Sequence, residues 1–217
     1  GTITQGYATG AVTGRANYVG GLVGYNAGSG SITKAYATGA VTGPYEVGGL
    51  VAYSDGTITQ AYATGAVMGT STSTFVGGLV GYSGGTITQA YASGAVMGTS
   101  TSTFVGGLVG FSGSTITSSY WDIGTTGKSA GVGDGSATGV TGLTTTAARS
   151  AGSYAAWGFG SVWYQAGDMR PILRSEAAAA VGGVITIRNL HQLQLMNADL
   201  GANYRLAGDI DASATNG

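Results

Sequence analysis

The sequence has no cysteine and few charged residues. Only 8% of its 217 residues are Asp, Glu, Lys or Arg, and the net charge is −1, whereas about a quarter of an average soluble protein is charged. Without cysteine the chain has no disulfide framework and no cysteine-ligated metal site. Without clustered Lys and Arg it lacks the positive charge that neutralises phosphates, which disfavours a nucleic-acid partner.

Long apolar runs and export signals are also missing. No stretch of about 18 apolar residues predicts a membrane span. The chain begins without Met or a basic signal sequence, and its first residues already belong to a repeat. We therefore interpret the sequence as a piece of a longer or processed chain.

Glycine is abundant, with 43 residues, roughly three times the average usage. Glycine-rich chains are often disordered, but disorder normally accompanies low hydrophobicity and high net charge. Here 43% of the residues are apolar. We expect a packed core.

Two sequence segments alternate along the first half of the chain. One reads Val-Gly-Gly-Leu-Val-Gly-Tyr or a close variant and starts at Val19, Val47, Val76 and Val105. The other reads Thr-Ile-Thr-Gln-Ala-Tyr-Ala-Thr-Gly-Ala-Val or a close variant, and its tyrosine recurs at Tyr7, Tyr36, Tyr62, Tyr91 and Tyr120. A fixed period between about 20 and 50 residues predicts a solenoid, a propeller or an array.

The repeat composition favours strands. Thr, Val, Ile and Tyr suit strands, and frequent glycine disfavours helices. A unit of 26–29 residues is shorter than a propeller blade of about 40 residues. We predict an all-β fold, a parallel β-solenoid with about three short strands per rung. In the third unit these strands are 58–63, 65–68 and 75–82.

Equivalent residues should stack from rung to rung at about the strand spacing of 4.8 Å. We expect an isoleucine ladder and a leucine ladder inside the solenoid. The isoleucines are Ile3, Ile32, Ile58, Ile87 and Ile116, and the leucines are Leu22, Leu50, Leu79 and Leu108. Aromatic stacks are expected for the five repeat tyrosines and for Tyr25, Tyr53, Tyr82 and Phe111.

The repeat pattern ends after residue 120. We assign 1–120 to the repeats and 121–174 to an aromatic cap with short helices, because a solenoid needs an atypical terminal unit over its last rung. Within the cap, 124–142 is predicted to be a loop, 143–151 a short helix capped by Thr144 or Thr145, and 161–173 two strands around a turn.

The last part of the chain has a different pattern. Residues 175–183 have linker composition. Residues 184–217 are interpreted as the start of a following solenoid or as a docking segment, with strands at 184–187 and 203–207 and a helix at 189–197.

The repeat resembles the GLUG motif of large secreted bacterial adhesins similar to filamentous haemagglutinin. The segments Ser119-Tyr-Trp-Asp122 and Arg170-Pro-Ile-Leu173 are similar to those that close such arrays. The resemblance implies a right-handed parallel β-helix, an extracellular or cell-surface location, and an adhesive or structural role without catalytic residues. Ala52 departs from the motif, since the other copies have glycine there.

One stretch matches a catalytic motif by its letters. Gly81-Tyr-Ser-Gly-Gly85 fits the Gly-x-Ser-x-Gly pattern of a nucleophile elbow. That chemistry needs a histidine nearby, and the single histidine, His191, is distant in sequence. A variable repeat corner is the interpretation that the residues favour.

Acidic residues are scarce. Glu46 and Asp55 are the carboxylates of the first 120 residues, and glycoside hydrolysis needs a pair within about 5–10 Å. Asp209 and Asp211 could bind a cation with Asn216, but solvation or turn capping is the use that the residues favour. We predict no catalytic residue, no cofactor and no metal site.

Threonines flank four of the five repeat isoleucines in a Thr-x-Thr pattern, as at Thr57–Thr59 and Thr86–Thr88, and Ile32 lies between Ser31 and Thr33. Flat rows of this kind occur on ice-binding solenoids. They are also good strand chemistry on an exposed wall. Rows of Tyr, Thr and Gln could instead contact sugars, so the sequence leaves three interpretations open.

Our functional expectation is a structural or adhesive, non-enzymatic segment of a large secreted bacterial surface protein that binds a host or matrix glycan or protein. The alternative is an extracellular filament subunit that stacks head to tail on other copies of itself. Its assembly edge would comprise Gly1, Thr2, Ile3, Thr4, Tyr204 and Leu206. A β-helix polysaccharide enzyme is disfavoured by the shortage of carboxylates.

Overall fold

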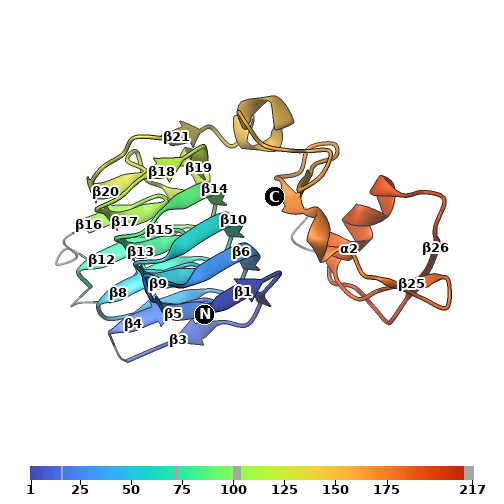
Figure 1. Ribbon diagram of the computed structural model, residues 1–217, viewed down its shortest axis with the longest axis horizontal. Coiled ribbons are helices and arrows are strands. Elements are labelled where there is room, and N and C mark those ends of the chain that lie inside the picture. The colour runs from blue at the N-terminus through green and yellow to red at the C-terminus, as the bar shows by residue number, and fades with distance from the viewer. Residues whose placement is uncertain (16, 71–72, 100–103, 213–217) are drawn as a thin grey trace. The chain divides into compact units, whose positions relative to one another are not determined.

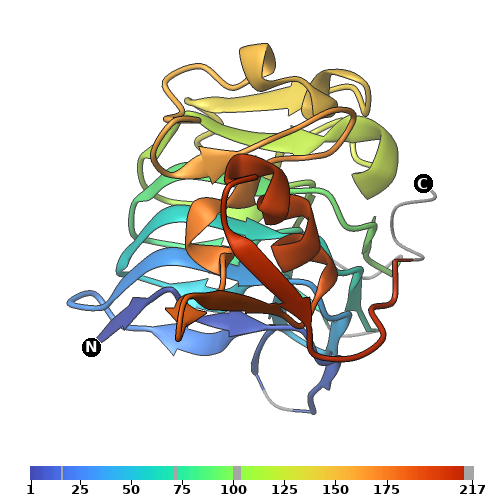
Figure 2. The same cartoon turned by 90° about the vertical axis from the view of Figure 1, so that its right-hand side faces the viewer.

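The computed structural model describes residues 1–15, 17–70, 73–99 and 104–212. The chain forms two compact units. Unit 1 comprises Gly1–Ala148 and Gly152–Ala156, and unit 2 comprises Arg149–Ala151 and Trp157–Gly217. Unit 1 confirms the predicted all-β fold, because its sheets are parallel and follow one another as the rungs of a solenoid (Figures 1 and 2).

The strands of unit 1 repeat in rungs. The first rung holds β1 (Thr2–Thr4), β2 (Tyr7–Ala8), β3 (Val12–Thr13), β4 (Tyr18–Gly20) and β5 (Val23–Asn26). The second holds β6 (Ser31–Ala37), β7 (Val41–Gly43), β8 (Glu46–Gly48) and β9 (Val51–Ser54). The third holds β10 (Thr57–Ala63), β11 (Val67–Gly69), β12 (Phe75–Gly77) and β13 (Val80–Ser83). The fourth holds β14 (Ile87–Ala92), β15 (Val96–Met97), β16 (Phe104–Gly106) and β17 (Val109–Ser112).

Corresponding strands of successive rungs form four sheets. Sheet A joins β1, β6, β10 and β14, sheet B joins β3, β7, β11 and β15, sheet C joins β4, β8, β12 and β16, and sheet D joins β5, β9, β13 and β17. Identical repeat positions pair with one another, as Ile32 does with Ile58 and Ile58 with Ile87. The hydrophobic pattern sets this register, since a slip of one residue would turn each isoleucine outward.

The strand predicted at 75–82 is two strands, β12 and β13, so a full rung has four strands instead of three. The chain turns between them at Gly78 and Leu79. A Cβ atom on Gly78 would lie 2.2 Å from the carbonyl oxygen of Gly107 in the next rung. Only glycine fits so close to a backbone atom, which explains the Gly-Gly pair of the motif.

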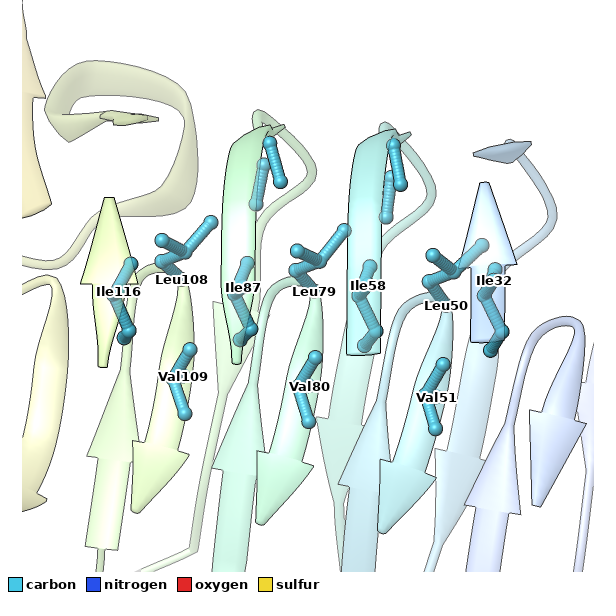
Figure 3. Packing of buried hydrophobic residues seen from close by; sticks show 14 of the residues in the cluster. Ile32, Leu50, Val51, Ile58, Leu79, Val80, Ile87, Leu108, Val109 and Ile116 are labelled. Carbon is cyan, nitrogen blue, oxygen red and sulfur yellow. The ribbon is translucent and has the colours of Figure 1, made fainter. Parts of the chain in front are cut away.

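Two separate cores run along unit 1. Figure 3 shows the larger one, where Ile58 of sheet A, Leu79 of the turn and Val80 of sheet D lie in adjacent columns. The smaller core consists of valines from sheets B and C, such as Val67 and Val76. Each fully buried aliphatic side chain contributes about 1.5–3 kcal/mol. Of the predicted ladders, Ile3 and Leu22 in the first rung are only half-buried.

The predicted loop at 124–142 is wrong, because the solenoid continues through it. β18 (Ile116–Thr117) and β19 (Ser119–Asp122) extend sheet A, β20 (Val132–Gly135) extends sheet D, and β21 (Val140–Leu143) pairs with β19. A short helix, α1 (Ile123–Thr126), follows β19. Asp122 caps it by accepting a hydrogen bond from the Thr125 backbone N–H at 3.1 Å. The glycine-rich composition of 124–142 led to the loop prediction, although these residues form a further rung with a different sequence.

Trp121 closes the larger core at its C-terminal end. It pairs in register with Ala92, replacing a methyl group with an indole. A Cβ atom on Gly107 would lie 2.4 Å from the Trp121 ring, and one on Gly131 would lie 2.5 Å from it. The indole N–H donates to the Lys128 carbonyl oxygen at 2.9 Å. Trp121, the first residue of the predicted aromatic cap, therefore covers this end of the larger core.

Beyond β21 come two single turns, η1 (Ala147–Arg149) and η2 (Ala151–Ser153), where a short helix was expected. The Thr144 hydroxyl accepts from the Ala147 backbone N–H at 3.1 Å, so Thr144 is the cap.

In unit 2, β22 (Trp163–Tyr164) pairs antiparallel with β23 (Ile172–Leu173), as the predicted strand–turn–strand requires.

Unit 2 continues with η3 (Arg174–Glu176), β24 (Ala180–Val181), β25 (Val184–Ile187), α2 (Leu190–Leu195), η4 (Met196–Ala198) and β26 (Asn203–Leu206). β25 and β26 are parallel and α2 connects them. The segment 175–183 is structured: buried Glu176 accepts from the Leu173 N–H at 2.8 Å and contacts His191 Nδ1 at 2.5 Å. Within the described residues, no helix is long and apolar enough to cross a membrane.

Candidate binding surfaces

Each strand of sheet A bends at one residue. The bend divides the face of the sheet that points away from the larger core into two parts, which we call walls. Lys34, Gln60 and Gln89 hold left-handed backbones, with φ of 53°, 56° and 51°. Gln5 and Ser118, at the same repeat position, have φ of 58° and 45°. The ladder of paired residues omits this position, passing from the Thr33–Thr59 pair to the Ala35–Ala61 pair. The sequence gives no sign of the bend, since neither glutamine nor lysine favours this conformation.

The wall before the bend carries two rows of hydroxyl side chains, which we call the threonine wall. The rows are Thr2, Ser31, Thr57, Thr86 and Thr115, and Thr4, Thr33, Thr59, Thr88 and Thr117. In strands such as β10 the isoleucine between the two rows points into the core. Every wall residue is exposed or half-buried. Neighbours lie about 4.8 Å apart across the strands and about 6.6 Å apart along them.

Small or uncharged groups border most of the threonine wall. Before it lies a column of glycines, where a Cβ atom on Gly56 would lie 2.3 Å from the Gly30 carbonyl oxygen and one on Gly85 would lie 2.0 Å from that of Gly56. After it lies the left-handed row, in which Gln60 Nε2 donates to Gln89 Oε1 at 3.2 Å. The charged residues of this border are Lys34 in the left-handed row and Asp55, two positions before Thr57.

The wall after the bend carries the repeat tyrosines, and we call it the tyrosine wall. Ring centroids lie 5.3 Å apart for Tyr7 and Tyr36 and 5.1 Å apart for Tyr36–Tyr62 and Tyr62–Tyr91, with nearly parallel planes. Tyr120 pairs in register with Tyr91. Tyr7 is 61% exposed, whereas the other four are buried. This column serves packing.

A second aromatic cluster lies where sheets C and D meet. Tyr53 and Tyr82 stack at 4.4 Å, Tyr82 and Phe111 at 5.1 Å, and Phe75 packs edge-on against Tyr82 at 5.4 Å. Tyr18, Tyr25 and Phe104 complete the cluster. Stacked rings cover one another's faces, so the cluster presents mainly ring edges, and a sugar would need a free face for stacking.

The carboxylates of the repeats lie in this aromatic cluster. Glu46 pairs in register between Tyr18 and Phe75, and desolvation raises the pKa of its carboxyl group. The Tyr25 hydroxyl donates to Asp55 Oδ2 at 3.1 Å. Desolvation, followed by the negative charge of Asp55, raises the pKa of Tyr53 to about 12.

The serine of the apparent nucleophile elbow is a corner residue. Ser83 is fully buried, and its hydroxyl donates to the Gly85 carbonyl oxygen at 2.9 Å. Ser54 and Ser112 make the same bond to the residue two positions later, at 3.4 and 3.2 Å. The hydroxyl groups hold the turn between one rung and the next.

The remaining predicted residues lie on edges or near the end of the described chain. Thr2, Ile3 and Thr4 form β1, which pairs with β6. Tyr204 and Leu206 lie in β26, which pairs with β25 in unit 2. Asp209 and Asp211 are exposed, and Asn216 lies outside the described residues. No group of three or more His, Cys, Asp or Glu able to hold a metal ion occurs in the part of the chain that the structure describes.

The comparison with protein families matches the GLUG motif at residues 15–42 and 73–97. Both matches begin ahead of a sheet C strand and run through sheets D and A into sheet B. The motif therefore corresponds to one rung, with the Gly-Gly turn near its start. No curated protein and no solved structure matches the chain in the other two comparisons.

Proposed function

We propose that the chain is a non-catalytic structural and adhesive segment of a large secreted bacterial surface protein. The observation that carries this proposal is the in-register stacking of near-identical rungs, with isoleucine on isoleucine and tyrosine on tyrosine. Such stacking repeats one surface at fixed intervals and joins neighbouring rungs by continuous strand pairing. Both properties suit a spacer that displays binding groups.

Surface chemistry supports the same proposal. The serine hydroxyl groups at the repeat corners are engaged in turns, and the two repeat carboxylates lie within aromatic packing. The exposed groups are hydroxyls, amides and ring edges, which make many weak contacts. The GLUG matches favour an extracellular location, and the absence of cysteine is compatible with export.

Stretching single molecules tests the structural part. A solenoid whose rungs contact only their neighbours unfolds stepwise, and a rung of 26–29 residues releases about 100 Å of extended chain. We expect force peaks at that interval. One unfolding event for the whole of unit 1 would contradict the spacer role.

Binding tests the adhesive part. The native chain, immobilised on beads, is exposed to arrays of host and matrix glycans and proteins, and heat-unfolded chain serves as the control. We expect saturable binding by the native chain alone. Failure to bind any member, or measurable turnover of a polysaccharide, would refute the adhesive proposal. Negative-stain electron microscopy of the same sample over a range of concentrations tests the alternative, in which copies stack into filaments.

A further inference from the structure

The threonine wall has a property that packing does not explain. Among the described residues, none of its hydroxyl side chains makes a hydrogen bond within the protein. Elsewhere in unit 1, Ser83, Ser119 and Thr125 donate to nearby carbonyl groups. The wall therefore offers a regular array of unsatisfied hydroxyl groups on one face.

The array is fixed in two dimensions. Thr59 pairs in register with Thr33 and Thr88, and Thr88 with Thr117, so the row has no offset between rungs. Threonine is β-branched and therefore stiff at χ1, so its hydroxyl and methyl groups keep their positions. Binding then costs little side-chain entropy.

The occupant of such a surface must itself be periodic and uncharged. The side chains of the wall are uncharged, and a polyanion would find only Lys34 at the border. The strand lattice of about 4.8 by 6.6 Å is comparable to the spacing of oxygen atoms on exposed planes of hexagonal ice. Ice can accept and donate hydrogen bonds at every site of its lattice.

We propose that the threonine wall binds the surface of ice crystals. Each hydroxyl contributes a weak contact, and the repetition over successive rungs sums these contacts into stable adsorption. The tyrosine wall and sheet B do not take part. This inference goes beyond the proposed function, because a spacer segment needs no affinity for ice.

The test measures thermal hysteresis and inhibition of ice recrystallisation with the complete chain. The double variant Thr59→Tyr/Thr88→Tyr places two bulky rings in the middle of the wall, and we expect both activities to be lost. The matched control Met68→Tyr/Met97→Tyr places the same rings on sheet B, where both methionines are exposed at 42% and 45%. It should keep full activity. Circular dichroism and melting temperatures establish that both variants fold.

A second double variant separates the contribution of the hydroxyl groups from the contribution of side-chain shape. Thr59→Val/Thr88→Val keeps the shape and removes the hydroxyl groups, and we expect a partial loss of hysteresis. The proposal is overturned if the native chain shows no more activity than a globular protein at the same concentration. It is also overturned if the sheet B control loses activity equally, or if the wall variants keep full activity.

Discussion

The side-chain amide of Gln60 donates a hydrogen bond to that of Gln89 at 3.2 Å, and both residues have left-handed backbones. Each such residue costs about 1–2 kcal/mol relative to an ordinary strand conformation. The amide contact and the pairing on either side of the bend offset this cost. The bend is what separates the threonine wall from the tyrosine wall.

Glycine should therefore be better than alanine at position 60. Both substitutions remove the amide contact, but only glycine relieves the strain at φ 56°, so we expect Gln60→Gly to be about 1 kcal/mol more stable than Gln60→Ala. Urea denaturation measures the difference. At Thr59, within the same strand, the order should reverse, because glycine weakens an ordinary strand. If the glycine and alanine variants had the same order of stability at both positions, the bend would carry no strain.

The Gly-Gly turn gives a second prediction. A Cβ atom on Gly77 would lie 1.9 Å from the Val80 carbonyl oxygen and 2.7 Å from the Gly110 nitrogen. Both are backbone atoms and cannot rotate away, so Gly77→Ala should destabilise unit 1 by about 3 kcal/mol. The control is Gly10→Ala, where nothing lies within 4 Å and the change should be within about 0.5 kcal/mol. Thermal unfolding of both variants decides whether the turn is this tight.

The sequence contained the repetition and therefore the parallel solenoid, the register and the interior position of residues such as Ile58 and Leu79. It did not contain the bend at Gln60, because that conformation is imposed by the surrounding rung and not by local preference. It also concealed the strands at Val132–Gly135 and Val140–Leu143. Those strands lack the repeat letters and pair because their neighbours already form an edge.

The threonine wall shows the same division. Its two rows could be read from the Thr-x-Thr pattern. The absence of internal hydrogen bonds and the glycine border at Gly56 depend on backbone positions, so only the structure reveals an unobstructed face.

Glu46 interrupts a column that is otherwise aromatic, since it pairs between Tyr18 and Phe75. Replacing it by phenylalanine should continue the stack and stabilise the fold by about 1 kcal/mol. Desolvation raises the pKa of Glu46 in the folded state, so its contribution to stability is complete at low pH and is lost as the pH rises through that pKa. The advantage of Glu46→Phe should therefore grow from about pH 4 towards neutrality.

Chemical denaturation at several pH values measures this advantage. Glu46→Gln is the matched control, because it removes the charge without adding a ring. Glu46→Gln should remove the part of the pH dependence of stability that comes from Glu46. It should gain less stability than the phenylalanine variant. Identical pH profiles for Glu46→Phe and the unmodified protein would contradict the assignment of a desolvated carboxylate.

Tyr53 gives a prediction at high pH. Desolvation, followed by the charge of Asp55, raises its pKa to about 12, whereas the pKa of an unfolded tyrosine is about 10. The folded state thus favours the neutral phenol, and the stability from this preference is complete below about pH 10 and lost as the pH rises further. Tyr53→Phe cannot ionise, so its stability should fall less steeply over that range. Melting temperatures measured across it, with tyrosinate absorbance as a second readout, test the claim. Asp55→Asn removes the second cause and should bring the Tyr53 titration to lower pH. An unchanged titration would show that the charge of Asp55 does not contribute.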